Sequence, residues 1–214
     1  MPRSITKTLL ALPHERFLWG PYLAKFKVSS SWCKQFLDLG QSLRKNEKNR
    51  KAARKILAGQ IKEEYLFDLD KHFWIKEDIA PYVHSWITGY KSISNDTMGE
   101  NPNASKEIKL VSCWINYMKA GEYNPSHIHW GATLSFVLYL KNPPHFPETH
   151  DTNTSTPGTI TFCYGESMKF VISERAFLPE ENALFVFPYH LRHSVLHFNG
   201  PGERISVSGN IVVS

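Results

Sequence analysis

The first part of the chain shows apolar residues at helical spacing. One such run covers 32–43 and follows three serines at 29–31, whose hydroxyl groups are suited to cap a helix. Gly40 weakens this prediction, because glycine costs helix stability relative to alanine. A second run, over 77–90, has acidic residues in its first turn and a continuous apolar stripe. We therefore expect two amphipathic helices, preceded by a candidate edge strand near 22–28.

The second part of the chain has the pattern of a β protein. Short alternating or apolar segments, bounded by Gly, Pro and Asn, follow one another without helical spacing between them. This pattern favours an antiparallel sandwich or barrel. The polar stretch 95–105 is the best candidate boundary, so we expect an N-terminal helical or irregular extension over 1–105 that packs on a β core over 106–214. The predicted strands are 108–117, 134–140, 158–164, 183–187 and 204–213.

Two histidines stand two positions apart, just before the second of these segments. If 124–140 is one strand, its side chains alternate between faces, so His127 and His129 point the same way. Two imidazoles on one face can chelate a metal ion. A His-x-His pair alone is a weak signal, because such pairs also occur on solvent-facing strands.

The last predicted strand carries a row of polar residues inside an otherwise hydrophobic segment. Arg204, Ser206, Ser208 and Asn210 share one face of this strand. Burying them is costly unless that face lines a pocket for a polar ligand. The arginine indicates a carboxylate, because its planar guanidinium can hold one through two hydrogen bonds.

Together these motifs resemble the Fe(II)- and 2-oxoglutarate-dependent oxygenases, whose core is a double-stranded β-helix, or jelly roll. That family carries His-x-Asp/Glu, a distal histidine, and an arginine on the following strand that binds the far carboxylate of 2-oxoglutarate. Here the matching residues are His127 and His129, then His193, then Arg204. The Arg-Ile-Ser triplet resembles the family's Arg-x-Ser/Asn motif, which makes Ser206 a further candidate contact to the same carboxylate.

The resemblance covers about residues 108–214. Asn116 is spaced like the cosubstrate-contacting asparagine of the alkylation-repair branch, in which a tyrosine follows two positions later; this chain has Met118 there. Tyr139 is a further candidate contact to the cosubstrate. The motifs Gly-x-x-x-Pro-x-His-x-His, Leu-Ser-x-Val-x-Tyr-Leu and Phe-Pro-x-x-Leu-x-His-x-Val look most like the small oxygenase-like proteins of tailed phages and marine bacteria.

His129 departs from the family pattern, because it stands where the family has a carboxylate. In one register, His127, His129 and His193 form a three-histidine metal site, which is acceptable because imidazole suits Fe(II). In the other register, His129 is the first ligand and Gly131 takes the carboxylate position and leaves it open, as in the halogenating branch. We favour the three-histidine register, because the spacing of Asn116 relative to the histidines supports it.

The resemblance implies an enzyme that uses Fe(II), 2-oxoglutarate and O2. It would oxidise, and most simply hydroxylate, a substrate that the sequence does not identify, with release of succinate and CO2. One alternative is a three-histidine cupin dioxygenase that does not use 2-oxoglutarate, but that chemistry has no need for Arg204. Another is a non-catalytic jelly-roll binding or structural protein, such as a phage component, that retains a degenerate metal site.

The net charge of +5 is unevenly distributed, because residues 44–55 are strongly basic. This segment suggests contact with nucleic acid, but a solvated linker or helix face is the favoured interpretation. The three cysteines form no C-x-x-C pair and are expected to be reduced, as in a cytoplasmic protein (the host cytoplasm if phage-encoded). No apolar run suggests a membrane span. The sequence predicts neither the substrate nor the oligomeric state.

Overall fold

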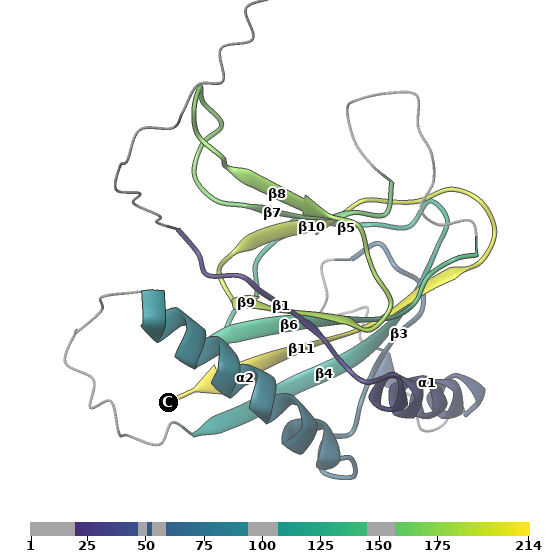
Figure 1. Cartoon of the computed structure of the whole chain (residues 1–214). Helices are drawn as coiled ribbons and strands as arrows, with labels where there is room; N and C mark the ends of the chain where they lie inside the picture. The colour runs from purple at the N-terminus through teal and green to yellow at the C-terminus, as the bar shows by residue number, and fades with distance from the viewer. Residues whose placement is uncertain (1–19, 47–50, 53–58, 94–106, 145–156) are drawn as a thin grey trace, which may run out of the picture.

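Two antiparallel β-sheets face each other in the computed structural model, which describes residues 20–46, 51–52, 59–93, 107–144 and 157–214 (Figure 1). The larger sheet has the strand order β1-β9-β6-β11-β4-β3-β2, and the smaller has the order β5-β10-β7-β8. The strands are β1 (Ala24–Lys27), β2 (Lys51–Ala52), β3 (Glu64–Leu66), β4 (Ile108–Lys119), β5 (Asn124–His127), β6 (Leu134–Lys141), β7 (Ile160–Cys163), β8 (Glu174–Phe177), β9 (Ala183–Pro188), β10 (Arg192–Val195) and β11 (Glu203–Val213).

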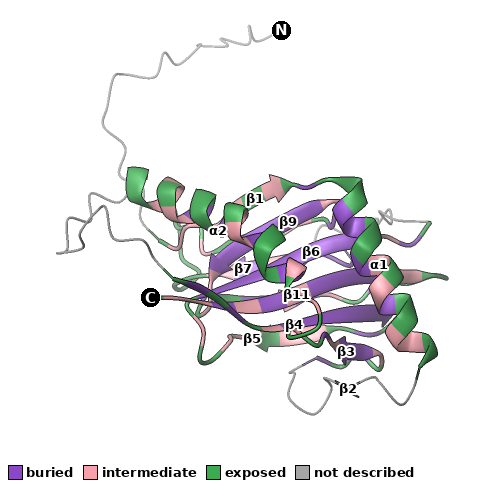
Figure 2. Cartoon of the chain, turned by 90° about the horizontal axis from the view of Figure 1, so that it is seen from below, coloured by how far each residue is buried: buried purple, intermediate pink, exposed green. Residues whose placement is uncertain are grey.

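Two helices cover the outer face of the larger sheet, α1 (Ser30–Lys45) and α2 (Trp74–Ile93) (Figures 1 and 2). Helix α1 begins as predicted, because the Ser29 hydroxyl accepts a hydrogen bond from the Trp32 N–H at 3.2 Å. Helix α2 is longer than the predicted 77–90. The prediction of a mainly β protein with N-terminal helices is confirmed.

The alternation of side chains along the central strands separates two hydrophobic cores. In β9, Leu184 and Val186 face the helices, whereas Phe185 and Phe187 face the smaller sheet. In β11, the apolar residues face the helices and the polar row faces the other sheet. The helices therefore bury one face of the larger sheet, and the space between the sheets holds both the second core and a cavity lined partly by polar residues.

The prediction of one continuous strand over 124–140 was wrong. Strand β5 ends at His127 and pairs with β10 in the smaller sheet, whereas β6 begins at Leu134 and pairs with β9 and β11 in the larger sheet. Between them the chain turns at Gly131, whose φ of +72° lies in the left-handed region that favours glycine. His129 therefore lies in a loop between the sheets, and Tyr139 lies in the opposite sheet from His127.

Several short strands were not predicted, because they are short and polar or charged. Strand β3 extends the larger sheet through the pairing of Glu64 with Asn116, and β10 carries the pairing of His193 with His127. Strand β1 lies at one edge of the larger sheet, which confirms the edge strand expected near 22–28. The polar stretch 95–105 lies outside the described residues, so the boundary after residue 105 stays a prediction.

The basic segment 44–55 begins with an arginine that is already paired. The Arg44 guanidinium donates hydrogen bonds to Glu63 (2.7 Å) and Glu203 (2.6 Å), which connects the end of α1 to the larger sheet. The paired guanidinium lowers the pKa of the Glu63 carboxyl to about 2. Arg44 therefore stabilises the fold, and residues 47–50 and 53–58 of this segment lie outside the described residues.

Gly40 allows α1 to lie close against the larger sheet. A Cβ added there would overlap Ile115 Cδ1 and would lie 2.5 Å from the Tyr117 hydroxyl oxygen. Both neighbours are buried, with side chains 0% and 1% exposed, so neither can move aside easily. The glycine that weakened the helix prediction is therefore needed for packing.

We predict that Gly40→Ala lowers the free energy of unfolding by about 1–3 kcal/mol, because the overlap outweighs the roughly 1 kcal/mol gained in helix propensity. Urea unfolding followed by circular dichroism measures the change. Gln41→Ala, at the next and exposed position of the helix, is the control and should leave stability within about 0.5 kcal/mol. A stabilised Gly40→Ala protein would contradict the packing account.

Candidate metal centre

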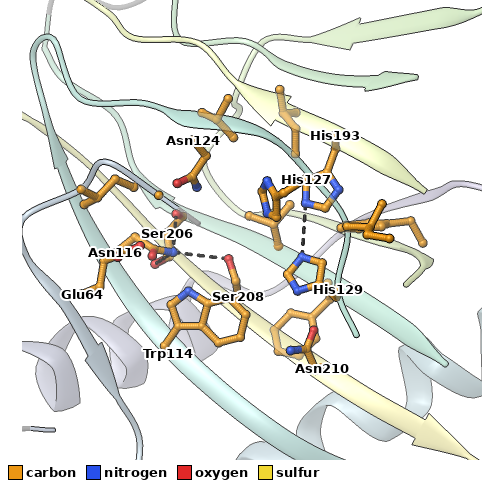
Figure 3. A pocket seen from close by; sticks show the side chains of 18 of the residues that line it. Glu64, Trp114, Asn116, Asn124, His127, His129, His193, Ser206, Ser208 and Asn210 are labelled. Carbon is orange, nitrogen blue, oxygen red and sulfur yellow. Dashed lines mark hydrogen bonds between the residues drawn. The ribbon is translucent and has the colours of Figure 1, made fainter. Parts of the chain in front are cut away.

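A cavity of about 780 Å³ lies between the two sheets. Its size is typical of a site that encloses a small molecule. Strands β4, β6 and β11 of the larger sheet form one wall, and β5, β7 and β10 of the smaller sheet form the other. Figure 3 shows that histidines from the smaller sheet and from the adjoining loop face a row of polar side chains on the larger sheet.

The three predicted histidines converge in this cavity. One ring nitrogen from each of His127, His129 and His193 lies within 4.8 Å of the others. The Nε2 atoms of His129 and His193 are 3.3 Å apart. Metal–imidazole bonds of about 2.0–2.1 Å place two ligand nitrogens of one ion roughly 3 Å apart, so this spacing fits a shared metal ion. Gly131, the alternative in the other register, is exposed and is not part of the cavity lining.

Backbone carbonyl groups orient two of the imidazole rings. His127 Nδ1 lies 2.8 Å from the Pro125 carbonyl oxygen, and His193 Nδ1 lies 2.9 Å from that of Leu191. A carbonyl oxygen can only accept, so each Nδ1 carries the hydrogen and each neutral ring has its lone pair on Nε2. Such hydrogen bonds to the second nitrogen typically orient histidine metal ligands. His129 is positioned differently, by its backbone N–H, which donates to the Tyr189 carbonyl oxygen at 2.9 Å.

Burial keeps the three rings neutral. Burial first, and then repulsion from the neighbouring histidines, lowers the pKa of His193 to about 3 and that of His129 to about 4. Burial also lowers the pKa of His127. At neutral pH each ring therefore keeps a lone pair on one of its two nitrogens, and this nitrogen can bind a metal ion. Three neutral imidazoles are a donor set that suits Fe(II) as well as Zn(II) and Cu(II).

Arg204 is a buried positive charge on the same wall of the cavity. Its side chain is 2% exposed, and within the described residues no carboxylate lies within ion-pair distance of it. One terminal nitrogen donates to the Gly158 carbonyl oxygen and the other contacts the Met118 thioether, which is a weak acceptor. Nε has no hydrogen-bond partner among the described residues.

This environment is unfavourable for a cation unless an anion binds beside it. Burial lowers the pKa of Arg204, yet the group stays charged at any physiological pH. A buried charge without a counter-charge costs several kcal/mol. The cavity next to Arg204 therefore favours an anionic ligand, and the planar guanidinium matches a carboxylate.

The other predicted contacts lie between Arg204 and the histidines. Asn116 Nδ2 donates to the hydroxyl oxygens of Ser206 and Ser208, both at 3.3 Å (Figure 3). Its Oδ1 atom and the Tyr139 hydroxyl are both buried and have no partner among the described residues. The Tyr139 ring lies beside Arg204, with its centroid 5.7 Å from the guanidinium carbon. These polar atoms could hydrogen-bond to a bound cosubstrate.

Trp114 and Trp130 were expected to belong to the core or the pocket wall, and both line the cavity. The ring centroid of Trp114 is 6.0 Å from that of His129. Ser112 was not predicted; it accepts a hydrogen bond from Asn210 (3.1 Å) at the end of the cavity away from Arg204. The alternation of β4 could have identified Ser112 on the face that carries Asn116. His190 is exposed, which fits polar surface.

Solved structures with a similar fold are oxygenases. A prolyl-4-hydroxylase from Pseudomonas putida is 14% identical with a TM-score of 0.53, over 89% of this chain and 91% of that chain. The collagen prolyl hydroxylase of Paramecium Bursaria Chlorella virus-1, solved as a 2-oxoglutarate complex, is 15% identical with a TM-score of 0.53, over 90% and 96%. A prolyl hydroxylase from Trichoplax adhaerens, in complex with a hypoxia inducible factor peptide fragment, is 16% identical with a TM-score of 0.51, over 89% and 83%. At these identities the similarity establishes the fold, which is the predicted double-stranded β-helix.

The family comparison assigns the class. Residues 112–210 match a family model described as "Putative 2OG-Fe(II) oxygenase". No curated protein matches the chain significantly. The match over residues 112–210 indicates an enzyme of the Fe(II)- and 2-oxoglutarate-dependent oxygenase class, which uses Fe(II) as cofactor and 2-oxoglutarate and O2 as cosubstrates. The predicted family and cofactors are confirmed. Within the described residues, no helix is long and apolar enough to cross a membrane.

Proposed function

We propose that this protein hydroxylates a C–H bond of its substrate at a three-histidine iron centre. His127, His129 and His193 would hold Fe(II), and Arg204 would hold the far carboxylate of 2-oxoglutarate. The observation that supports this most is the presence, in one cavity, of three converging neutral imidazoles and a buried arginine that has no carboxylate partner among the described residues. When bound, Fe(II) and 2-oxoglutarate supply the activation of O2 and the oxidative decarboxylation that releases succinate and CO2.

The protein's residues contribute positioning and charge. Arg204 and Ser206 would orient the cosubstrate from its far end, and Tyr139 and Asn116 would offer hydrogen bonds along its length. Arg204, Asn116 and Ser206 are buried between the two sheets. Polar contacts to a cosubstrate would be stronger there than in bulk water. The backbone carbonyl groups of Pro125 and Leu191 keep two imidazole rings in the tautomer that binds metal.

The third histidine changes the charge of the metal centre. With a carboxylate ligand, Fe(II) would retain a charge of +1, whereas three neutral imidazoles leave it at +2. The dianion of 2-oxoglutarate would offset two of the three positive charges that iron and Arg204 together bring to the site. We therefore infer that 2-oxoglutarate contributes strongly to the charge balance of the loaded site. A three-histidine dioxygenase without 2-oxoglutarate would leave Arg204 uncompensated.

We predict that Arg204→Ala weakens 2-oxoglutarate binding at least roughly 30-fold and changes Fe(II) affinity little. Removing one partner of a buried charge pair costs about 2–5 kcal/mol, and each 1.4 kcal/mol is a factor of ten. Anaerobic titrations of each ligand measure the two affinities. Arg192→Ala removes an exposed arginine at the same cavity and is the matched control, which should bind 2-oxoglutarate normally. Equal loss of both ligands in Arg204→Ala would indicate a structural role.

We also predict that His129→Ala weakens Fe(II) binding at least tenfold, whereas His129→Asp retains it. Aspartate supplies a ligand atom and one negative charge at the same position. Anaerobic Fe(II) titration of both variants gives the affinities. His190→Ala, an exposed histidine in the turn before β10, is the control. An unchanged affinity in His129→Ala would contradict the three-histidine site and favour the register with Gly131.

A further inference from the structure

Exposed apolar side chains are concentrated in the connection between β7 and β8. This connection spans residues 164–173, and we call residues 164–172 the hairpin tip. Phe170 is 94% exposed and Ile172 is 72% exposed. Exposed apolar patches on soluble proteins commonly mark binding sites. The exposed apolar residues of the hairpin tip are Tyr164, Met168, Phe170, Val171 and Ile172.

The backbone of the hairpin tip is also unusual. Phe170 has a φ of +67°, in the left-handed region that bulky residues rarely adopt. Such a conformation costs of order 1–3 kcal/mol. Here the Phe170 ring is exposed, so within the part of the chain that the structure describes no burial of this ring offsets the cost. Strained positions of this kind often belong to functional surfaces.

The hairpin tip lies at the metal end of the smaller sheet. Cys163, the last residue of β7, pairs with Arg192, which directly precedes His193. Trp130, the neighbour of His129, is 81% exposed and lines the cavity at the same end. Figure 1 shows the hairpin at the side of the molecule where β11 ends, whereas Arg204 lies near the start of β11. A ligand bound to the hairpin tip would therefore lie at the metal end of the cavity.

The charges of the hairpin favour a polypeptide over a nucleic acid. Lys169 and Arg175 are balanced by Glu166 and Glu174, whereas phosphate binding requires an excess of basic groups. The cavity lining beside His129 also favours a polypeptide. Ser112 and Asn210 are neutral polar residues there, and neutral hydrogen-bonding groups suit peptide amides.

Strand β8 adds a main-chain feature. It is the outermost strand of the smaller sheet within the described residues, so one of its edges has N–H and C=O groups without a neighbouring strand. Such an edge can pair with an extended peptide, and alternate side chains of that peptide then reach apolar pockets or patches. An apolar hairpin tip beside an open strand edge fits this mode of recognition.

We infer that the substrate is a polypeptide segment, extended, rich in apolar residues and without net charge, that binds across the hairpin tip and enters the cavity past Trp130. This inference extends the proposed function by naming the substrate class. The hairpin tip is the docking surface, and the neutral groups beside His129 receive the residue that is oxidised.

A selection from random twelve-residue peptides displayed on phage tests the inference with the full chain in the absence of added metal. We expect enriched peptides to be apolar and uncharged, and a synthetic copy to bind with an affinity that falls at least tenfold in the double variant Phe170→Ser/Ile172→Ser. The matched control is Phe73→Ser, which removes an aromatic ring that is 65% exposed just before α2. It should bind normally. Both variants change exposed residues, and thermal unfolding verifies that they fold.

Several outcomes would overturn the inference. They are an absence of enriched peptides, binding that the double variant does not weaken, preferential binding of a single-stranded oligonucleotide, or a dimer in sedimentation velocity that the double variant dissociates. If a synthetic peptide of the chain's own residues 1–19 bound more tightly than the enriched peptide, the hairpin tip would be a docking surface for that segment and not for a substrate.

A second readout separates this inference from the proposed function. The enriched peptide should stimulate succinate release by the wild-type protein with Fe(II) and 2-oxoglutarate, whereas His193→Ala should bind the peptide but release no succinate. Peptide binding without succinate release in the wild type would contradict the proposed function and leave the docking surface intact.

Discussion

The buried charge of Arg204 is the constraint on which the rest of the site depends. A guanidinium enclosed between two sheets, with a carbonyl oxygen and a thioether as its contacts, is favourable only when an anion is bound. The polar row of β11 leads from this charge towards three histidines, which are neutral and add no negative charge. The cavity therefore favours a dianionic cosubstrate at one end and a cation at the other. Because the polar residues of β11 line the cavity, its apolar residues lie on the opposite face, against the helices.

The two helices help to stabilise a fold that buries polar and charged residues in its cavity. They bury one face of the larger sheet under a continuous apolar layer that includes Phe36, Ile79 and Val83. Gly40 brings α1 close enough to complete that layer, and Arg44 attaches its end to the sheet. The larger of the two hydrophobic cores lies on this side of the sheet, so part of the opposite face can carry polar residues that serve the site.

The sequence predicted the parts of the molecule that depend on local patterns. Alternation in β11 identified its polar face, and the resemblance to the oxygenases assigned His127, His129, His193 and Arg204 to one site; all four line one cavity. The error over 124–140 came from tertiary pairing: β5 and β6 are adjacent in sequence but belong to different sheets, and only Gly131 gave a local sign of the turn. Ser112 was missed because its role depends on which face of β4 meets the cavity. The exposure of Phe170 could not be inferred, because an apolar residue in a loop is equally compatible with burial.

The most direct test of the central claim is an anaerobic titration of the protein with Fe(II) and then 2-oxoglutarate, followed by visible absorbance. If the three histidines hold iron and Arg204 orients the cosubstrate, a weak metal-to-ligand charge-transfer band should appear only when both are present, and it should saturate at one equivalent of each. Failure to retain iron, together with the absence of that band, would contradict the account.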